Sequence, residues 1–189
     1  MRNSKLYPLI LVAVMSALGT VIYMVFPEIP LVPGIGYLKV DLSDIPALIT
    51  CLTVGPVYGV FVEVFKNIIH LTRTTTFGIG EMMNVGIGSF MLVSMWFCNK
   101  WLSLKFKCDS AAYYVSAAIT ITLTIVVGWI LNAALTPVFY ILAGFPITAD
   151  GILAGVWGST ILNTIKSAVT ILPFWPLVHI SKKVSKRFS

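Results

Sequence analysis

The chain has 189 residues, 58% of them hydrophobic and only 11% charged, with a formal net charge of +6. Soluble domains have about 45–50% apolar and about 25% charged residues, so this composition excludes an ordinary soluble fold. Together with a mean hydropathy of +0.94, it predicts one integral membrane domain over residues 1–189, embedded in the lipid of the cell membrane as a multi-pass protein.

Six apolar segments follow one another along the chain, at about 6–26, 45–59, 60–71, 79–99, 112–143 and 152–181. A helix needs about 20 residues to cross a bilayer, and the first and fourth segments have that length. The fifth and sixth are longer and must tilt, bend or project. Pro173 and Pro176 are expected to bend or end the sixth segment.

The number of spans depends on how residues 45–71 are divided. Gly55, Pro56 and Gly59 predict a turn between two short helices in this stretch. Both ends of the chain are basic, which places both termini in the cytoplasm under the positive-inside rule. An even number of spans is then required. We therefore expect an all-α bundle of six transmembrane helices.

The basic residues lie in three clusters at the ends of apolar segments: Arg2 and Lys5, then Lys100, Lys105 and Lys107, then Lys182, Lys183, Lys186 and Arg187. They form neither a nucleic-acid-binding motif nor a basic face, so we expect no nucleic-acid partner. The same orientation places residues 27–44 outside the cell as a long first loop. This loop is rich in Pro and Gly but keeps apolar residues, which suits either a lid over a pocket or an ordinary packed loop.

Three polar side chains lie deep inside apolar segments, where polar groups are destabilising and usually face a cavity or another helix. They are Asn132 in the fifth segment and Asn163 and Lys166 in the sixth. Lys166 needs a partner, either an acid on another helix or the oxygen atoms of a ligand. Asn132 offers both donors and an acceptor, for a neighbouring helix or for a ligand. These alternatives stay open at the level of the sequence.

Further polar residues share helix faces and predict a packing network of neutralised charges. On the third segment they are Glu63, Lys66, Asn67 and His70, and on the fourth they are Glu81 and Asn84. We expect His70 to be a hydrogen-bonded structural group.

The sequence contains no HExxH, GxSxG or phosphate-loop motif, and its three cysteines have no metal-ligand spacing. We therefore expect no enzyme activity and no metal site. Ala13 and Ala17 form a small-xxx-small pair in the first segment. Such a pair lets another helix approach closely, either within this chain or from a partner protein.

Four stretches together form a recognisable pattern. The most specific is Tyr37-Leu38-Lys39-Val40-Asp41-Leu42-Ser43-Asp44-Ile45-Pro46, and the others are Lys66-Asn67, Gly80-Glu81-Met82-Met83-Asn84, and Asn163 with Lys166. This pattern resembles the riboflavin-specific S components of energy-coupling factor (ECF) vitamin transporters, whose first-loop signature is similar to the first of these stretches. The resemblance covers essentially the whole chain.

This resemblance implies a high-affinity subunit that binds riboflavin from outside, as a transported ligand and not as a cofactor. A transmembrane T subunit and two ATPase subunits would drive its delivery into the cell, with Ala13 and Ala17 docking on the T subunit. We predict that Asn132, Asn163 and Lys166 bond the polar edge or tail of the ligand.

In the same prediction, Lys39, Val40 and Asp41 close over the ligand from the first loop. The alternatives are an S component for another vitamin or precursor, a self-sufficient secondary transporter, and a membrane scaffold without a ligand.

Overall fold

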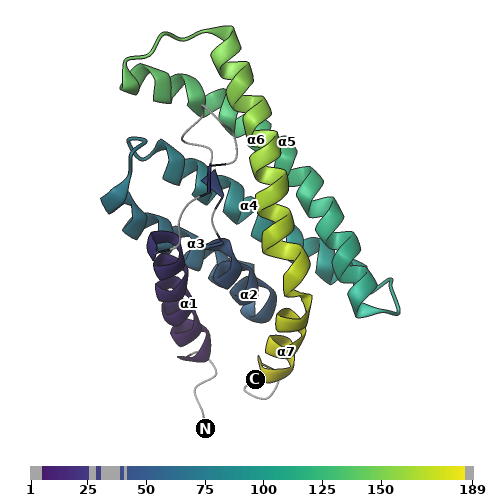
Figure 1. The fold of residues 1–189 in the computed structure, drawn as a ribbon. Helices are drawn as coiled ribbons and strands as arrows, with labels where there is room; N and C mark the ends of the chain where they lie inside the picture. Colours follow the sequence, from purple (N-terminus) through teal and green to yellow (C-terminus); the bar gives the residue numbers. More distant parts are fainter. Residues whose placement is uncertain (1–5, 26–28, 31–38, 41, 186–189) are drawn as a thin grey trace.

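The computed structural model describes residues 6–25, 29–30, 39–40 and 42–185, and within them the predicted all-α class is confirmed (Figure 1). The elements in chain order are α1 (Leu6–Val25), β1 (Ile29–Pro30), β2 (Lys39–Val40), α2 (Asp44–Val54), α3 (Pro56–His70), η1 (Leu71–Arg73), α4 (Ile79–Leu102), α5 (Asp109–Ala143), α6 (Ala149–Ile171), η2 (Leu172–Phe174) and α7 (Trp175–Ser185). The two short strands pair antiparallel, with Ile29 opposite Val40. Most of the expected outer loop at 27–44 lies outside the described residues.

The α-helical pattern of the last apolar segment is interrupted where its prolines predict. Helix α6 ends at Ile171, Pro173 lies in the 3-10 turn η2, and Pro176 lies in the first turn of α7. Proline has no backbone N–H to donate and its pyrrolidine clashes with the preceding turn, so the α-helical pattern stops there. Since α7 continues the path of α6 after this turn, the two together form the sixth helix of the bundle.

The division of residues 45–71 into two helices is confirmed, but the break lies at Gly55 and not near residue 59. Gly55 has φ 134°, a conformation that favours glycine, and Pro56 opens α3 in the position where proline is best tolerated. Gly59 stays helical. A Cβ atom at Gly59 would lie 2.9 Å from the Cα of Cys51, so its missing side chain lets α3 pack closely on α2.

Helix α2 is the centre of the bundle. It contacts α1, α3, α4, α6 and α7, and Ala47, Leu48 and Cys51 on it are completely buried. Its 11 residues span about 16 Å, well short of the roughly 30 Å hydrocarbon core. Within the described part of the chain, four helical stretches are long and apolar enough to cross a membrane: α1, α4, α5, and α6 with its continuation to Ile180.

The remaining helices surround α2 and expose apolar side chains. Helices α5 and α6 pack along each other as a long hairpin, and α1 packs on α3. In Figure 1, α1 begins and α7 ends at the lower end of the bundle, whereas the α5–α6 turn lies at the upper end. Side chains such as Leu9, Ile130 and Trp157 are at least 60% exposed, as expected for surfaces that face lipid.

We expect Gly59→Ala to lower the free energy of unfolding by about 1–3 kcal/mol, because the added methyl group meets the backbone of α2 and cannot be relieved by a side-chain rotation. Thermal unfolding in detergent measures the change. The matched control is Gly86→Ala, whose Cβ would meet only the flexible end of Leu131, at 3.1 Å. Equal melting temperatures for the two variants would contradict this view of the α2–α3 contact.

Candidate functional site

A cavity of about 410 Å³ lies between the helices, within the range of about 300–1,000 Å³ that is usual for small-molecule sites. Its wall combines apolar and polar side chains from α1 through α6. The lining residues are Tyr23, Met24, Asp44, His70, Arg73, Thr75, Thr76, Ile79, Gly80, Glu81, Met83, Asn84, Ile87, Gly88, Met91, Asn132, Thr136, Phe139, Leu162, Asn163, Lys166 and Ser167.

Two buried amides among the lining residues each have one hydrogen-bonding atom without a partner. Asn132 Nδ2 donates to the carbonyl of Gly128 at 2.8 Å, one turn earlier in α5. Its Oδ1, and Nδ2 of Asn163, have no hydrogen-bond partner among the described residues. A buried polar atom without a partner is destabilising, and such atoms in a cavity wall are suited to a ligand. Asn132 thus offers an acceptor and Asn163 a donor.

The amide of Asn163 has room because its neighbour on α5 lacks a side chain. A Cβ atom at Gly128 would overlap Nδ2 of Asn163 and lie 3.1 Å from its Cγ. Glycine inside a helix is normally unfavourable relative to alanine. Here it lets the α6 amide lie directly against the α5 backbone.

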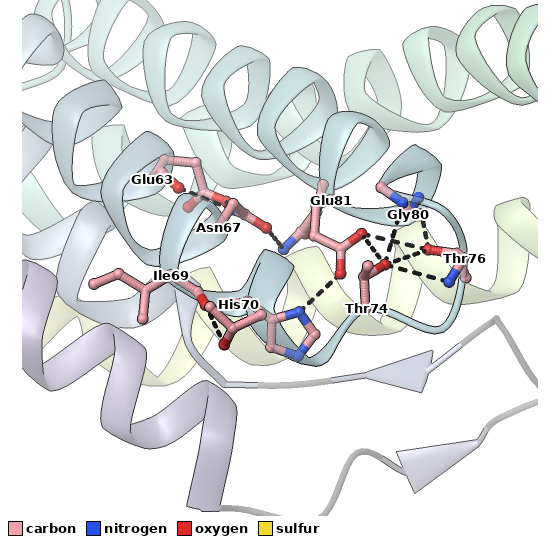
Figure 2. A network of polar contacts seen from close by, with 11 residues as sticks. Glu63, Asn67, Ile69, His70, Thr74, Thr76, Gly80 and Glu81 are labelled. Atoms are coloured by element: carbon pink, nitrogen blue, oxygen red, sulfur yellow. Dashed lines mark hydrogen bonds and ion pairs between the residues drawn. The ribbon is translucent and has the colours of Figure 1, made fainter.

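Lys166 joins a closed set of side-chain contacts that we call the polar ring. Its Nζ forms an ion pair with Asp44 Oδ2 at 3.1 Å and donates to Asn84 Oδ1 at 2.5 Å. Asn84 Nδ2 donates to Asn67 Oδ1 at 2.9 Å. Asn67 Nδ2 donates to Glu63 Oε1 at 3.0 Å, and Figure 2 shows these two residues. Contacts of Lys66 close the set. Its Nζ pairs with Glu63 Oε2 at 2.9 Å and with Asp44 Oδ1.

The polar ring balances its charges. It contains two carboxylates, two ammonium groups and two amides, contributed by α2, α3, α4 and α6. The predicted packing network of Glu63, Lys66 and Asn67 is therefore confirmed. For Lys166, the structure shows the partner acid on another helix as Asp44, while the same ammonium also lines the cavity. A buried charge is tolerable only with such partners.

A second polar cluster lies one helical turn from the polar ring on α3 and α4. His70 Nδ1 lies 2.9 Å from Glu81 Oε1, and Glu81 Oε2 accepts hydrogen bonds from the hydroxyl groups of Thr74 at 2.9 Å and Thr76 at 3.3 Å (Figure 2). The imidazole of His70 stacks on Tyr23 with ring centroids 3.7 Å apart. These contacts connect α1, α3 and the start of α4. The expected hydrogen-bonded role of His70 is confirmed, although its side chain also lines the cavity.

The cavity brings together three of the residues predicted to bind ligand, namely Asn132, Asn163 and Lys166. Lys39 and Val40 form β2, whose backbone contacts α6, and Asp41 lies outside the described residues.

Ala13 and Ala17 are exposed on α1, away from the cavity. The buried face of that helix carries Val12, Ser16 and Gly19 instead. The predicted small-residue pair is therefore not used for packing within the described part of the chain.

Several cavity residues were not singled out from the sequence. Asp44 was quoted only within the first-loop signature, and no role was assigned to Arg73, Thr75 or Thr76. The signal for Asp44 is its place at the start of a largely apolar helix, where a buried acid needs a cation. For Thr76, it is the position five residues before Glu81, whose carboxylate its hydroxyl group reaches.

Comparison with known proteins places the chain among transporters. The family model of the ECF transporter, substrate-specific component, matches residues 8–179. The chain belongs to this family. The resemblance found in the sequence is thereby confirmed, and it covers most of the chain.

Two relatives and one solved structure illustrate the match. The riboflavin transporter RibU of Lactococcus lactis subsp. cremoris (strain NZ9000) is 30% identical, covering 94% of this chain and 88% of the relative. The riboflavin transporter FmnP of Bacillus subtilis (strain 168) is 29% identical, covering 95% and 93%. A solved S component of a bacterial ECF transporter superposes with a TM-score of 0.75 at 24% identity, covering 93% of this chain and 95% of that one. It shows that the fold is shared.

We expect Lys66→Met to reduce the free energy of unfolding by about 3–5 kcal/mol, because it leaves two buried carboxylates without one of their cations. Thermal unfolding in detergent tests this. The control is Lys105→Met, since the Lys105 side chain is exposed and contacts only the face of Trp101 among the described residues. A Lys66→Met protein as stable as the control would show that the polar ring does not hold the helices together.

Proposed function

We propose that this chain is the riboflavin-binding subunit of an ECF importer, with a transport role and no catalytic role. The observation that carries the proposal is that the unpartnered acceptor of Asn132 and donor of Asn163 belong, with the Lys166 ammonium, to a cavity wall that combines apolar and polar side chains. The relatives named as riboflavin transporters support the choice of ligand.

The chemistry of riboflavin matches this wall group by group. One end of its ring system is a flat, apolar dimethylbenzene, and the other is a pyrimidine edge that presents an N–H between two carbonyl groups. Asn132 Oδ1 accepts from that N–H, while Asn163 Nδ2 and Lys166 Nζ donate to the carbonyl oxygens. Apolar side chains, including Ile87, Met91 and Phe139, pack against the flat faces.

The hydroxylated tail of riboflavin lies near Arg73, Thr75 and Thr76, which also line the cavity. Lys39, Val40 and Asp41 close over the ligand from the first loop. The contact of β2 with α6 supports this part of the proposal, because it brings the end of that loop to the helix that carries Asn163 and Lys166.

The proposal includes a topology in the membrane and the partner subunits. The chain is one integral domain of the cell membrane with six spans, its termini in the cytoplasm and its first loop outside. In support, α1 begins and α7 ends at the same end of the bundle. A transmembrane T subunit docks on the exposed Ala13 and Ala17, and two ATPase subunits supply the energy for release inside. No nucleic acid takes part.

Detergent-purified protein is expected to quench riboflavin fluorescence on binding. It should also be stabilised against heat by riboflavin more than by other vitamins in a panel, since a ligand that binds only the folded state stabilises it by mass action. Protein that binds another vitamin in preference, or no vitamin at all, would contradict the assignment.

The variants Asn132→Ala and Asn163→Ala should each weaken riboflavin binding by about tenfold or more, because each leaves a polar group of the ligand buried without a partner. Fluorescence titration gives the dissociation constants. The control is Asn99→Ala, which removes an asparagine that is equally buried, at 4% exposure, near the far end of α4 and outside the cavity wall. Loss of binding in the control, or none in the two test variants, would reject these contacts.

Replacing Ala13 or Ala17 with Trp should leave riboflavin binding intact and prevent co-purification with the T subunit and its ATPases, because a bulky side chain keeps the partner helix away. Ile130→Trp is the matched control, since Ile130 is also exposed, at 63%, but lies on α5. Normal assembly of both alanine variants would place the docking surface elsewhere.

A further inference from the structure

Asp44 holds an unusual position among the acidic residues, because each of its oxygens faces an ammonium group from a different helix. Oδ1 pairs with Lys66 of α3, and Oδ2 pairs with Lys166 of α6 at 3.1 Å. The Asp44 side chain is 1% exposed and lies at the start of the buried helix α2. The backbone of that helix therefore fixes where the carboxylate sits.

The ammonium that Asp44 neutralises is the one beside the amide donor of the cavity. Lys166 follows Asn163 by three residues, so the two side chains share a face of α6, and both line the cavity. An isolated ammonium group in surroundings of low dielectric constant attracts anions strongly, whereas an ion pair has a much weaker field at a distance. The Asp44 carboxylate therefore weakens the attraction of this part of the cavity wall for anions.

The other charged groups that line the cavity do not replace this function. Glu81 is already bonded to His70 and two threonine hydroxyl groups, and Arg73 lies on the η1 turn. Glu63 and Lys66 lie behind the wall, in the polar ring. Among the described residues that line the cavity, Asp44 is the acid that contacts the Lys166 ammonium.

We propose that Asp44 is a specificity-determining residue, which makes the cavity select an uncharged hydrogen-bonding edge over an anionic one. It does so by cancelling the charge of Lys166 and fixing its position, without itself bonding the ligand. The proposal rests on the proposed function, in which the uncharged edge is the pyrimidine edge of riboflavin. It predicts that removing this one carboxylate changes which ligands are preferred, in addition to how tightly they bind.

The experiment compares two probes, riboflavin and 8-hydroxyriboflavin. The second is ionised at neutral pH and spreads its negative charge onto the pyrimidine edge. For each variant, the ratio of the two dissociation constants is measured by fluorescence and absorbance titration. Because both probes meet the same variant, a general loss of affinity or stability cancels in the ratio.

In Asp44→Asn, binding of the anionic probe should improve relative to riboflavin by at least about tenfold, since the Lys166 ammonium loses the carboxylate that lies 3.1 Å from it. The matched control is Glu63→Gln, which removes the same charge from the polar ring. Glu63 is fully buried, pairs with Lys66 instead of Lys166, and does not line the cavity. This variant is expected to lose stability but to keep the wild-type ratio.

Two further variants keep the proposal testable if Asp44→Asn does not fold. Lys166→Gln removes the cation and leaves the carboxylate, so binding of the anionic probe should weaken relative to binding of riboflavin. Asp44→Glu retains the negative charge, so both probes should bind more weakly while the ratio of their dissociation constants stays close to wild type.

An unchanged ratio in Asp44→Asn or in Lys166→Gln, or equal shifts in Asp44→Asn and Glu63→Gln, would overturn the role of Asp44 alone. Wild-type protein that binds neither flavin would instead overturn the proposed function itself.

Discussion

The balance of charge in the polar ring is the constraint on which the rest of the structure depends. A carboxylate or an ammonium group buried alone is strongly destabilising, and only close partners of opposite charge make it tolerable. Since the four charges come from α2, α3 and α6 and are linked through Asn84 of α4, these helices are held in one relative arrangement. The cavity is the space that this arrangement leaves beside Lys166, so the fold and the candidate site use the same contacts.

Two glycines leave room for buried polar side chains from neighbouring helices. A Cβ atom at Gly88 would lie 2.8 Å from Glu63 Oε1, and one at Gly128 would overlap Asn163. Each glycine therefore opens a place for a polar side chain from a neighbouring helix. The reason for glycine at these positions lies in the neighbouring helix, because within its own helix each glycine is less favourable than alanine.

The sequence predicted the helices and pointed to the buried polar groups, but not which of them meet. Apolar length, Gly55 and the basic ends of the chain led to six helices, and Asn132, Asn163 and Lys166 do line one cavity. The pairing of Lys166 with Asp44 was not accessible, because helix periodicity relates only near neighbours. The break before α3 was placed too late because Gly59, which serves close packing, was interpreted as part of the turn.

The shortness of α2 has a consequence for how the protein is made. A stretch of 11 residues that begins with an aspartate is a poor substrate for insertion into the bilayer by the translocon, which favours long apolar segments. Its carboxylate finds Lys166 only after the last long helix has entered the membrane. Helix α2 is therefore expected to take its central place late in biogenesis, when newly synthesised helices associate within the lipid.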